Sequence, residues 1–190
     1  MTRTQASFSL EYILLGFLYQ SPIHGYDLYK QLCNLKGISI IWHLKMSQLY
    51  ALLDKLEKDG LLTSRHVPGQ ALLVRKEYQI TPQGQQRFLS WVSNPVEHGR
   101  EMRQEFLAKL FFAQKAGVEG YLKLIDEQTA VCGRWLSSLN LSSSNLTHDA
   151  NFERLVFQYR ISQVRAMIEW LAFCRVEIEG LLPQKSGEQE

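Results

Sequence analysis

The sequence has little cysteine and no residue pattern typical of a disulfide framework or a metal site. Its three cysteines are far apart and form no Cys-x-x-Cys pair, so disulfide pairing is not expected. We interpret Cys33, Cys132 and Cys174 as small apolar side chains used in packing, with a redox-sensing thiol as the alternative. The five histidines form no His-x-x-x-His or His-Glu-x-x-His pair, so we predict neither a metal site nor a cofactor.

Long apolar runs and catalytic motifs are absent as well. No run approaches the roughly 20 residues needed to cross a bilayer, and the N-terminus lacks the apolar stretch of a signal peptide. We therefore expect a cytoplasmic protein that does not associate with a membrane. The chain also has no Gly-x-Ser-x-Gly motif and no glycine-rich loop able to hold a phosphate, so no enzyme is predicted.

Charge is present but unevenly distributed. Residues 1–95 contain ten Lys or Arg against six Asp or Glu, whereas residues 96–190 contain eleven against thirteen. A basic N-terminal half followed by a mildly acidic half is typical of a DNA-binding region attached to a domain that does not bind DNA. Charge alone supports this interpretation weakly, since most exposed lysines and arginines only contact water.

The first sixty residues predict three helices. We expect the first to be capped by Ser9 and ended by Ser21-Pro22, and the second to start at His24-Gly25 and end before Gly37. Residues 38–43 are apolar and β-branched, which indicates a short strand or a buried connector. The third helix has Ser47 as its predicted cap and Asp59-Gly60 as its end, with the glycine left-handed. Its apolar stripe follows helical spacing and consists of Leu49, Leu52, Leu53 and Leu56.

The periodicity then changes from helical to alternating. Residues 61–67 and 71–80 predict two strands around a Pro68-Gly69 turn, and thus a two-stranded hairpin. Thr81-Pro82 predicts a fourth helix that runs to about Val92, with threonine as cap and proline in the first turn. We place the boundary of the first domain at Pro95.

The remaining residues predict helices only. We expect a helical domain over residues 96–182 and a flexible tail over 183–190. The last helix, roughly 149–180, has two apolar tracks, so it needs two partners: its own chain and a second subunit. One track contains Phe152, Val156, Tyr159, Trp170 and Phe173. The predicted homodimer contact is on the other track and consists of Val164, Ile168, Leu171 and Ile178.

Three helices followed by a hairpin are the element order of a winged helix-turn-helix. The fold class predicted is therefore mainly α, with a winged head followed by a helical dimerisation domain. A helix fits the major groove of B-DNA, and basic side chains neutralise phosphates. The predicted contacts to double-stranded DNA lie on the third helix and the wing: Lys45, Ser47, Gln48, Tyr50, Lys55, Arg65, His66, Arg75 and Lys76. The alternative is a winged-helix module that binds protein instead, because a fold does not decide a function.

Several motifs together resemble the PadR family of transcriptional regulators. They are His24-Gly25-Tyr26, the segment from Ser47-Gln-Leu-Tyr50 to Gly60-Leu-Leu, Tyr78-Gln-Ile-Thr81-Pro-Gln-Gly84, and the later segment 103–110. The resemblance covers about residues 8–180, and the long C-terminal half is similar to the larger, AphA-like subgroup. It implies a homodimer that binds an inverted-repeat operator, usually as a repressor and in some members as an activator.

Two further residues have open interpretations. Gly25 either permits close packing at the start of the second helix or brings the backbone to a phosphate. The four tryptophans are expected in the core and the dimer contact. The alternative is a pocket for a small aromatic effector, for which Trp91 is the candidate because it lies near the junction of the two domains.

Overall fold

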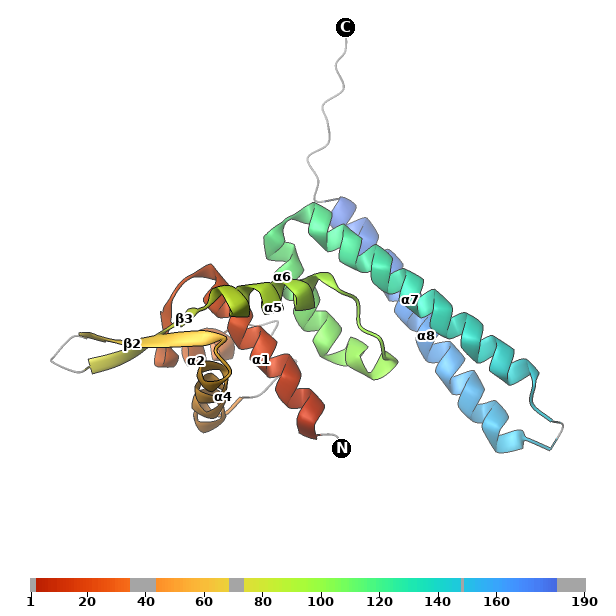
Figure 1. Ribbon diagram of the computed structural model, residues 1–190. Coiled ribbons are helices and arrows are strands. Elements are labelled where there is room, and N and C mark those ends of the chain that lie inside the picture. The colour runs from red at the N-terminus through yellow and green to blue at the C-terminus, as the bar shows by residue number, and fades with distance from the viewer. Residues whose placement is uncertain (1–2, 35–43, 69–73, 148, 181–190) are drawn as a thin grey trace, which may run out of the picture. The chain divides into compact units, whose positions relative to one another are not determined.

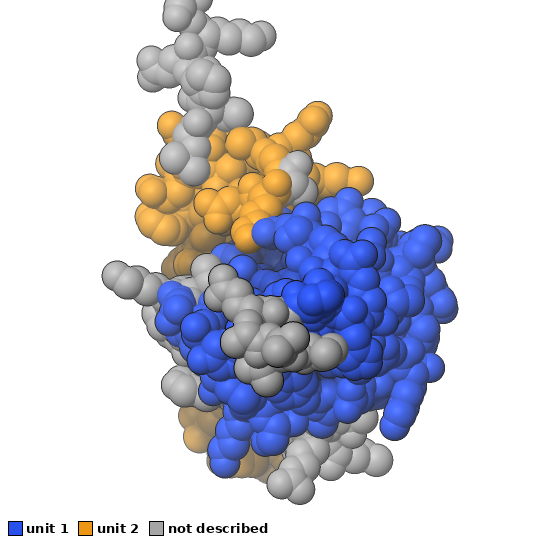
Figure 2. Space-filling model, turned by 90° about the vertical axis from the view of Figure 1, so that its left-hand side faces the viewer, with its two compact units in different colours: residues 1–92, 107–112 blue, residues 93–106, 113–190 orange. Residues whose placement is uncertain are grey.

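The computed structural model describes residues 3–34, 44–68, 74–147 and 149–180 (Figure 1). It divides into two compact units: unit 1 contains residues 1–92 and 107–112, and unit 2 contains residues 93–106 and 113–190 (Figure 2). The boundary expected at Pro95 lies close to the first division. Residues 107–112, which we expected in the C-terminal domain, belong instead to unit 1. The expected tail over 183–190 and the apolar stretch 38–43 lie outside the described residues.

Unit 1 is a small winged helix. Its elements in chain order are α1 (Arg3–Gln20), β1 (Ile23–His24), α2 (Gly25–Asn34), α4 (Met46–Lys58), β2 (Leu62–Pro68), β3 (Val74–Ile80) and α5 (Pro82–Ser93). The predicted helices and hairpin are thus present, but α1 begins well before Ser9. The backbone already has helical conformation from Arg3, so Ser9 lies inside the helix instead of capping it.

The sheet has three strands, where the sequence predicted two. The strand order is β1-β3-β2, and both pairs are antiparallel. In β1, Ile23 pairs with Tyr78 and His24 pairs with Glu77. A strand of two residues shows no alternation, so the pattern of the sequence could not reveal it. Figure 1 shows β2 and β3 as a two-stranded arm that extends beyond the helices of unit 1.

The ends of α4 differ in how well they were predicted. At the C-terminal end, Gly60 has φ of 71°, and the amide of Leu61 donates to the carbonyl of Leu56 at 2.9 Å. This is the glycine-terminated end that the sequence predicted. At the N-terminal end the cap is Lys45, not Ser47. The Gln48 side chain accepts a hydrogen bond from the Lys45 amide at 3.1 Å, so Ser47 lies within the first turn instead of preceding it.

The core of unit 1 follows the predicted apolar stripe. Leu49, Leu53 and Leu56 are fully buried, and α5 is fixed to the end of β3 by Thr81. The Thr81 hydroxyl accepts from the Gly84 amide at 3.1 Å, which confirms threonine as the cap. The side chains fully buried with them include Leu14, Leu18, Leu28, Leu62 and Tyr78.

Unit 2 contains a helical hairpin. After the short 3₁₀ helix η2 (Gly99–Arg103), α6 (Glu105–Ala116) passes through residues assigned to both units, and α7 (Val118–Ser144) and α8 (Asn151–Glu179) follow. Figure 1 shows α7 and α8 lying side by side along most of their length. None of the helices described is both long and apolar enough to cross a membrane.

The cysteines do not pair with one another. Cys132 is buried, Cys174 is half-buried and Cys33 is exposed. Burial raises the pKa of the Cys132 and Cys174 thiols above the ordinary range. A raised pKa leaves less of the reactive thiolate, so these two thiols suit the packing role better than the redox role.

Candidate nucleic-acid interface

The predicted DNA contacts lie on two surfaces of unit 1, the exposed side of α4 and the wing. Leu49, Leu53 and Leu56 turn one side of α4 into the core, so helical spacing places Ser47, Ala51 and Asp54 on the opposite side. All three are exposed, as are Lys45, Gln48 and Tyr50.

Acidic residues occur only in the C-terminal half of α4. The N-terminal end presents Lys45, Ser47 and Gln48, with no acidic residue in the first turn. The C-terminal half carries Asp54 and Glu57 together with Lys55 and Lys58. In helix-turn-helix proteins the N-terminal residues of the recognition helix contact base edges. The charge distribution of α4 therefore suits contact through its N-terminal end.

Lys55 is exposed but already has a partner within the chain. Its Nζ lies 2.6 Å from Glu11 Oε1 on α1, and the Glu11 side chain is almost completely buried. This hydrogen bond raises the pKa of Lys55. A buried carboxylate needs a cation beside it, so Lys55 stabilises the packing of α4 on α1. The sequence could not show this pairing, because the two residues are 44 positions apart.

Lys76 also forms ion pairs within the chain. Its Nζ lies 2.8 Å from Glu57 Oε2 and 3.7 Å from Asp54 Oδ1. The hydrogen bond from Lys76, followed by that from the Ser64 hydroxyl, lowers the pKa of Glu57, and the same bond to Glu57 raises the pKa of Lys76. Lys76 thus ties β3 to α4.

Strand geometry explains why Lys76 and Arg75 differ. Successive side chains point to opposite faces of a sheet. Lys76 shares the face of the buried Tyr78 and lies 5.0 Å from its ring centroid. Arg75 is on the other face and is exposed. The sequence suggested that these neighbours act together, but the sheet separates them.

Arg65 is paired across the wing. It lies directly opposite Glu77 in the register of β2 and β3, and its Nη2 is 2.7 Å from Glu77 Oε2. The Arg65 side chain is 70% exposed, so this pair contributes little to stability. The pair nevertheless lowers the net positive charge of the face of the wing that carries Arg65 and Arg75, which we call the outer face. His66 is exposed on the inner face, opposite Lys76.

Gly25 has a packing role in this structure. A Cβ at this position would lie only 2.7 Å from Cε1 of Tyr50. The start of α2 is therefore in close contact with the Tyr50 ring, and any larger residue would displace that ring. Of the two interpretations of Gly25, close packing at the start of the second helix therefore explains why a glycine lies beside Tyr50 of α4.

Two residues of α2 join the exposed polar surface of unit 1 although the sequence did not single them out. Tyr26 is half exposed, and Lys30 Nζ lies 4.6 Å from the centroid of its ring. Their spacing of four residues places both on one side of α2. That spacing, next to the His24-Gly25-Tyr26 motif, was the available signal.

Trp91, the candidate effector contact, is buried in unit 1. Its ring stacks on Tyr12 with centroids 4.9 Å apart and planes inclined by 5°, and Lys109 Nζ lies 5.3 Å from the ring centroid. Only 7% of Trp91 is exposed. A planar compound would have to displace Tyr12 to stack on this indole.

The predicted dimer contacts on α8 are mostly used within one chain. Val164, Leu171 and Ile178 are at most 6% exposed in the single subunit, and Ile168 is half-buried. These side chains face α7, because the two helices of the hairpin bury apolar side chains against each other. The exposed apolar side chains of α8 belong to the other track and its flank: Phe152, Leu155, Val156, Tyr159, Phe173 and Val176.

Two family models match the chain, one in each half. The model of the transcriptional regulator PadR-like family matches residues 14–90, and the virulence activator alpha C-term model matches residues 102–179. The negative transcriptional regulator PadR of Bacillus subtilis (strain 168) is 30% identical over 103 residues. That alignment covers 54% of this chain and 56% of the relative, so the chain spans just over half the length of the curated protein it matches.

Solved structures with a similar fold include two from Bacillus. Bacillus subtilis PadR in complex with operator DNA is 23% identical, with a TM-score of 0.45, and the match covers 89% of this chain and 98% of that one. The PadR-like transcriptional regulator of Bacillus cereus is 22% identical, with a TM-score of 0.39, and the match covers 90% and 98%. The winged unit and the helical half each match their own family model, and the chain therefore contains a domain of the PadR-like family of transcriptional regulators followed by a virulence activator alpha C-term region.

Proposed function

We propose that this PadR-like regulator binds double-stranded operator DNA through the N-terminal end of α4 and the wing. The observation that carries the proposal is the separation of the Lys and Arg side chains among the predicted DNA contacts into two groups. Lys55, Arg65 and Lys76 are paired with carboxylates. Lys45 and Arg75 are exposed and have no carboxylate partner among the described residues. Cations without a partner are the ones available to neutralise phosphates.

The residues have distinct roles in this proposal. Gln48 reads a base edge through its amide nitrogen, because its oxygen already caps α4; glutamine contacts of this kind give sequence preference. Ser47, Lys45 and Tyr50 bind phosphates beside it, and Arg75 and His66 do so from the wing. Lys55, Arg65 and Lys76 hold the interface together from within the chain.

We also propose that the regulator is a homodimer and that the exposed track of α8 forms the contact. Phe152, Tyr159, Ala166 and Phe173 recur every seven residues and are all exposed, so they line one side of the helix. A two-fold dimer would bury this surface on both chains. Two heads related in this way would read the two halves of an inverted repeat.

Repression is the direction of control that the relatives favour. The Bacillus subtilis relative is named as a negative regulator, and a dimer bound at a promoter blocks access to it. The site of action is then the cytoplasm, where bacterial DNA lies. Control by a small molecule remains a prediction from the sequence: Bacillus subtilis PadR has been solved with p-coumaric acid, whereas Trp91 here is covered by Tyr12.

The salt dependence of DNA binding tests the proposal. Fluorescence anisotropy with the upstream region of the protein's own gene should give an affinity that falls steeply with salt, with a logarithmic slope of about −0.9 per phosphate neutralised. A duplex of shuffled sequence serves as control and should bind more weakly at each salt concentration. Absence of binding at every salt concentration would favour the alternative, a winged-helix module that binds protein.

A further inference from the structure

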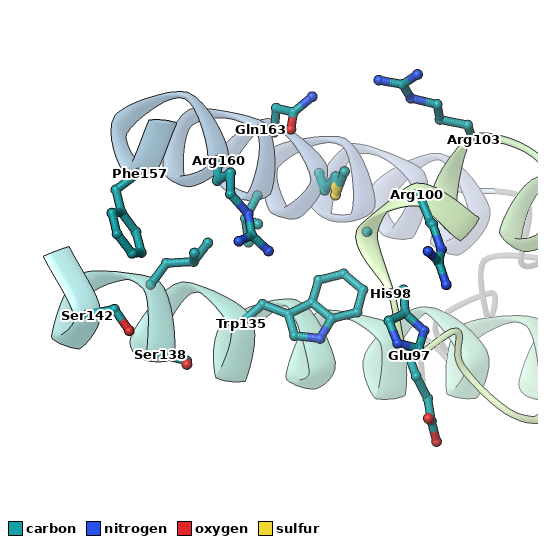
Figure 3. A pocket seen from close by; sticks show the side chains of 14 residues that line it. Glu97, His98, Arg100, Arg103, Trp135, Ser138, Ser142, Phe157, Arg160 and Gln163 are labelled. Carbon is teal, nitrogen blue, oxygen red and sulfur yellow. The ribbon is translucent and has the colours of Figure 1, made fainter. Parts of the chain in front are cut away.

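Unit 2 contains a cavity that the proposed DNA contact does not use. It lies between η2, the second half of α7 and the first half of α8 (Figure 3). Its volume is about 740 Å³, which is within the range of sites that hold small organic molecules. The Trp135 side chain from α7 and the Phe157 and Met167 side chains from α8 form much of its apolar wall.

The wall is closely built around the indole of Trp135. A Cβ placed on Gly99 would lie 3.8 Å from Cε of Met167 and 4.0 Å from Cζ3 of Trp135. A methyl group at this position would therefore just reach both side chains, so Gly99 of η2 lies beside them. Figure 3 shows the indole lying across the middle of the cavity, with the side chain of Phe157 at one end.

The charge of the lining is positive. Arg100 and Arg103 come from η2 and Arg160 comes from α8, whereas Glu97 is the only carboxylate in the lining. In the view of Figure 3 the guanidinium groups of Arg160 and Arg100 lie on either side of the Trp135 indole, and Glu97 points away from it. Arg100 Nε is 4.0 Å from Glu101. In the part of the chain that the structure describes, no carboxylate pairs with Arg160.

A buried glutamine holds this side of the cavity in place. Gln128 of α7 is completely buried. Its Oε1 accepts from the Val96 amide at 2.7 Å, and its Nε2 donates to the Val96 carbonyl at 3.2 Å. At the other end of the segment, Phe106 meets the Trp170 ring edge to face, with centroids 6.1 Å apart. Residues 96–106 are thus fixed at both ends. This holds Arg100 in a defined position, which reduces the conformational entropy that is lost when a ligand binds.

We propose that this cavity binds an organic carboxylate with an apolar body. A carboxylate matches the planar fork of a guanidinium with two parallel hydrogen bonds, and Arg160 supplies that fork. The apolar body lies against the Trp135 indole and the Phe157 ring, where its burial is favourable. The inference concerns unit 2 alone and does not depend on DNA binding.

Isothermal titration calorimetry of the full chain with 2-naphthoate tests the site. Naphthoate should bind, and 2-naphthamide, which has the same body without the charge, should bind at least about tenfold more weakly, because one charge-assisted hydrogen bond is lost. Arg160→Gln should weaken naphthoate binding by a similar factor. Arg165→Gln is the matched control: Arg165 is an exposed arginine of the same helix outside the cavity, and its loss should leave the affinity unchanged.

Trp135→Leu separates the apolar contribution from the charge. It should weaken naphthoate and naphthamide by the same factor, and circular dichroism of each variant would show that α7 and α8 are intact. Equal affinity for the acid and the amide, or equal effects of the two arginine variants, would overturn the proposal. An affinity that rises as the protein is diluted would also overturn it, since a second copy of the chain would then occupy the cavity.

Discussion

The two units leave different groups exposed. In unit 1 the apolar sides of α4 and of the sheet are buried, and the exposed groups at the start of α4 and along the wing include cations and hydroxyls. In unit 2 the seam between α7 and α8 is buried, and the groups left over are apolar side chains of α8, with Phe152 74% and Leu155 70% exposed. A surface of the first kind suits a polyanion, and one of the second kind suits another apolar surface.

The comparison also shows why counting charges or apolar residues is not sufficient. Lys55 and Lys45 lie on the same helix, yet only Lys55 is paired. Val164 and Phe173 lie on one helix as well, but the first is 6% and the second 60% exposed. A residue can bind a partner only through the groups that its own chain leaves exposed and unpaired.

The largest effect is expected from charging the exposed track of unit 2. The double variant Phe173→Glu, Val176→Glu should convert the proposed dimer into a monomer, and operator affinity should fall by a factor of more than about 100, because the second head no longer adds its binding energy. Sedimentation equilibrium at micromolar concentration gives the oligomeric state. Glu177→Gln, on the same turn, is the control and should remain dimeric; a monomeric wild-type chain would contradict the architecture.

The second-largest effect is expected from removing the two unpaired cations among the predicted DNA contacts. Lys45→Ala with Arg75→Ala should weaken binding to all DNA sequences, and the salt slope should fall by about 0.9 for each phosphate that is no longer neutralised. The matched variant Lys58→Ala removes an exposed lysine from the C-terminal end of α4 and should leave the slope unchanged. Anisotropy titrations across salt concentrations measure both. Equal salt slopes for the two variants would show that the position of a cation on unit 1 does not affect DNA binding.

A smaller and more selective effect is expected at Gln48. Gln48→Ala should cost about 1–3 kcal/mol at the base pair that it reads and little on shuffled DNA. It also removes the acceptor for the Lys45 amide, so thermal unfolding must be followed in parallel. Competition with single-base operator variants identifies the position affected. If binding to all sequences weakens equally, Gln48 binds a phosphate and the base contact lies elsewhere.

The smallest effect concerns the paired cations. The pKa of Glu57 is lowered in the folded chain from its ordinary value of 4.5, so its contribution to stability is present above pH 4.5 and is lost as the pH falls through the folded-state value. Glu57→Gln should therefore unfold with a weaker dependence on acid pH than the wild type. At neutral pH the variant also releases Lys76, so nonspecific DNA affinity should rise slightly. Denaturant titrations from pH 3 to pH 7 test the first effect.

Local patterns predicted the elements well, and long-range pairing limited the prediction of the site. The stripe of α4, its end at Gly60 and the cap at Thr81 each depend on residues within a few positions of one another, so they can be read from the sequence. The Glu11–Lys55 and Glu57–Lys76 pairs join separate elements, and no local pattern reports them.

The same limit applies to α8 and Gln128. Both apolar tracks of α8 were visible in the sequence, but only packing against α7 decides which one is buried. Gln128 looks like an ordinary polar position of a long helix. Two hydrogen bonds to the backbone of Val96, 32 residues away, satisfy its amide and so compensate the cost of its burial.

The short strand β1 has a consequence for the order in which the head folds. Its pairing of Ile23 with Tyr78 closes a loop that contains α2, α4 and β2. Closing a long loop is entropically costly and slow compared with forming a local hairpin. We expect β2 and β3 to associate first and β1 to join them late. During synthesis, residues 23 and 24 leave the ribosome long before their partners, so the three-stranded sheet is completed only after the whole wing has been made.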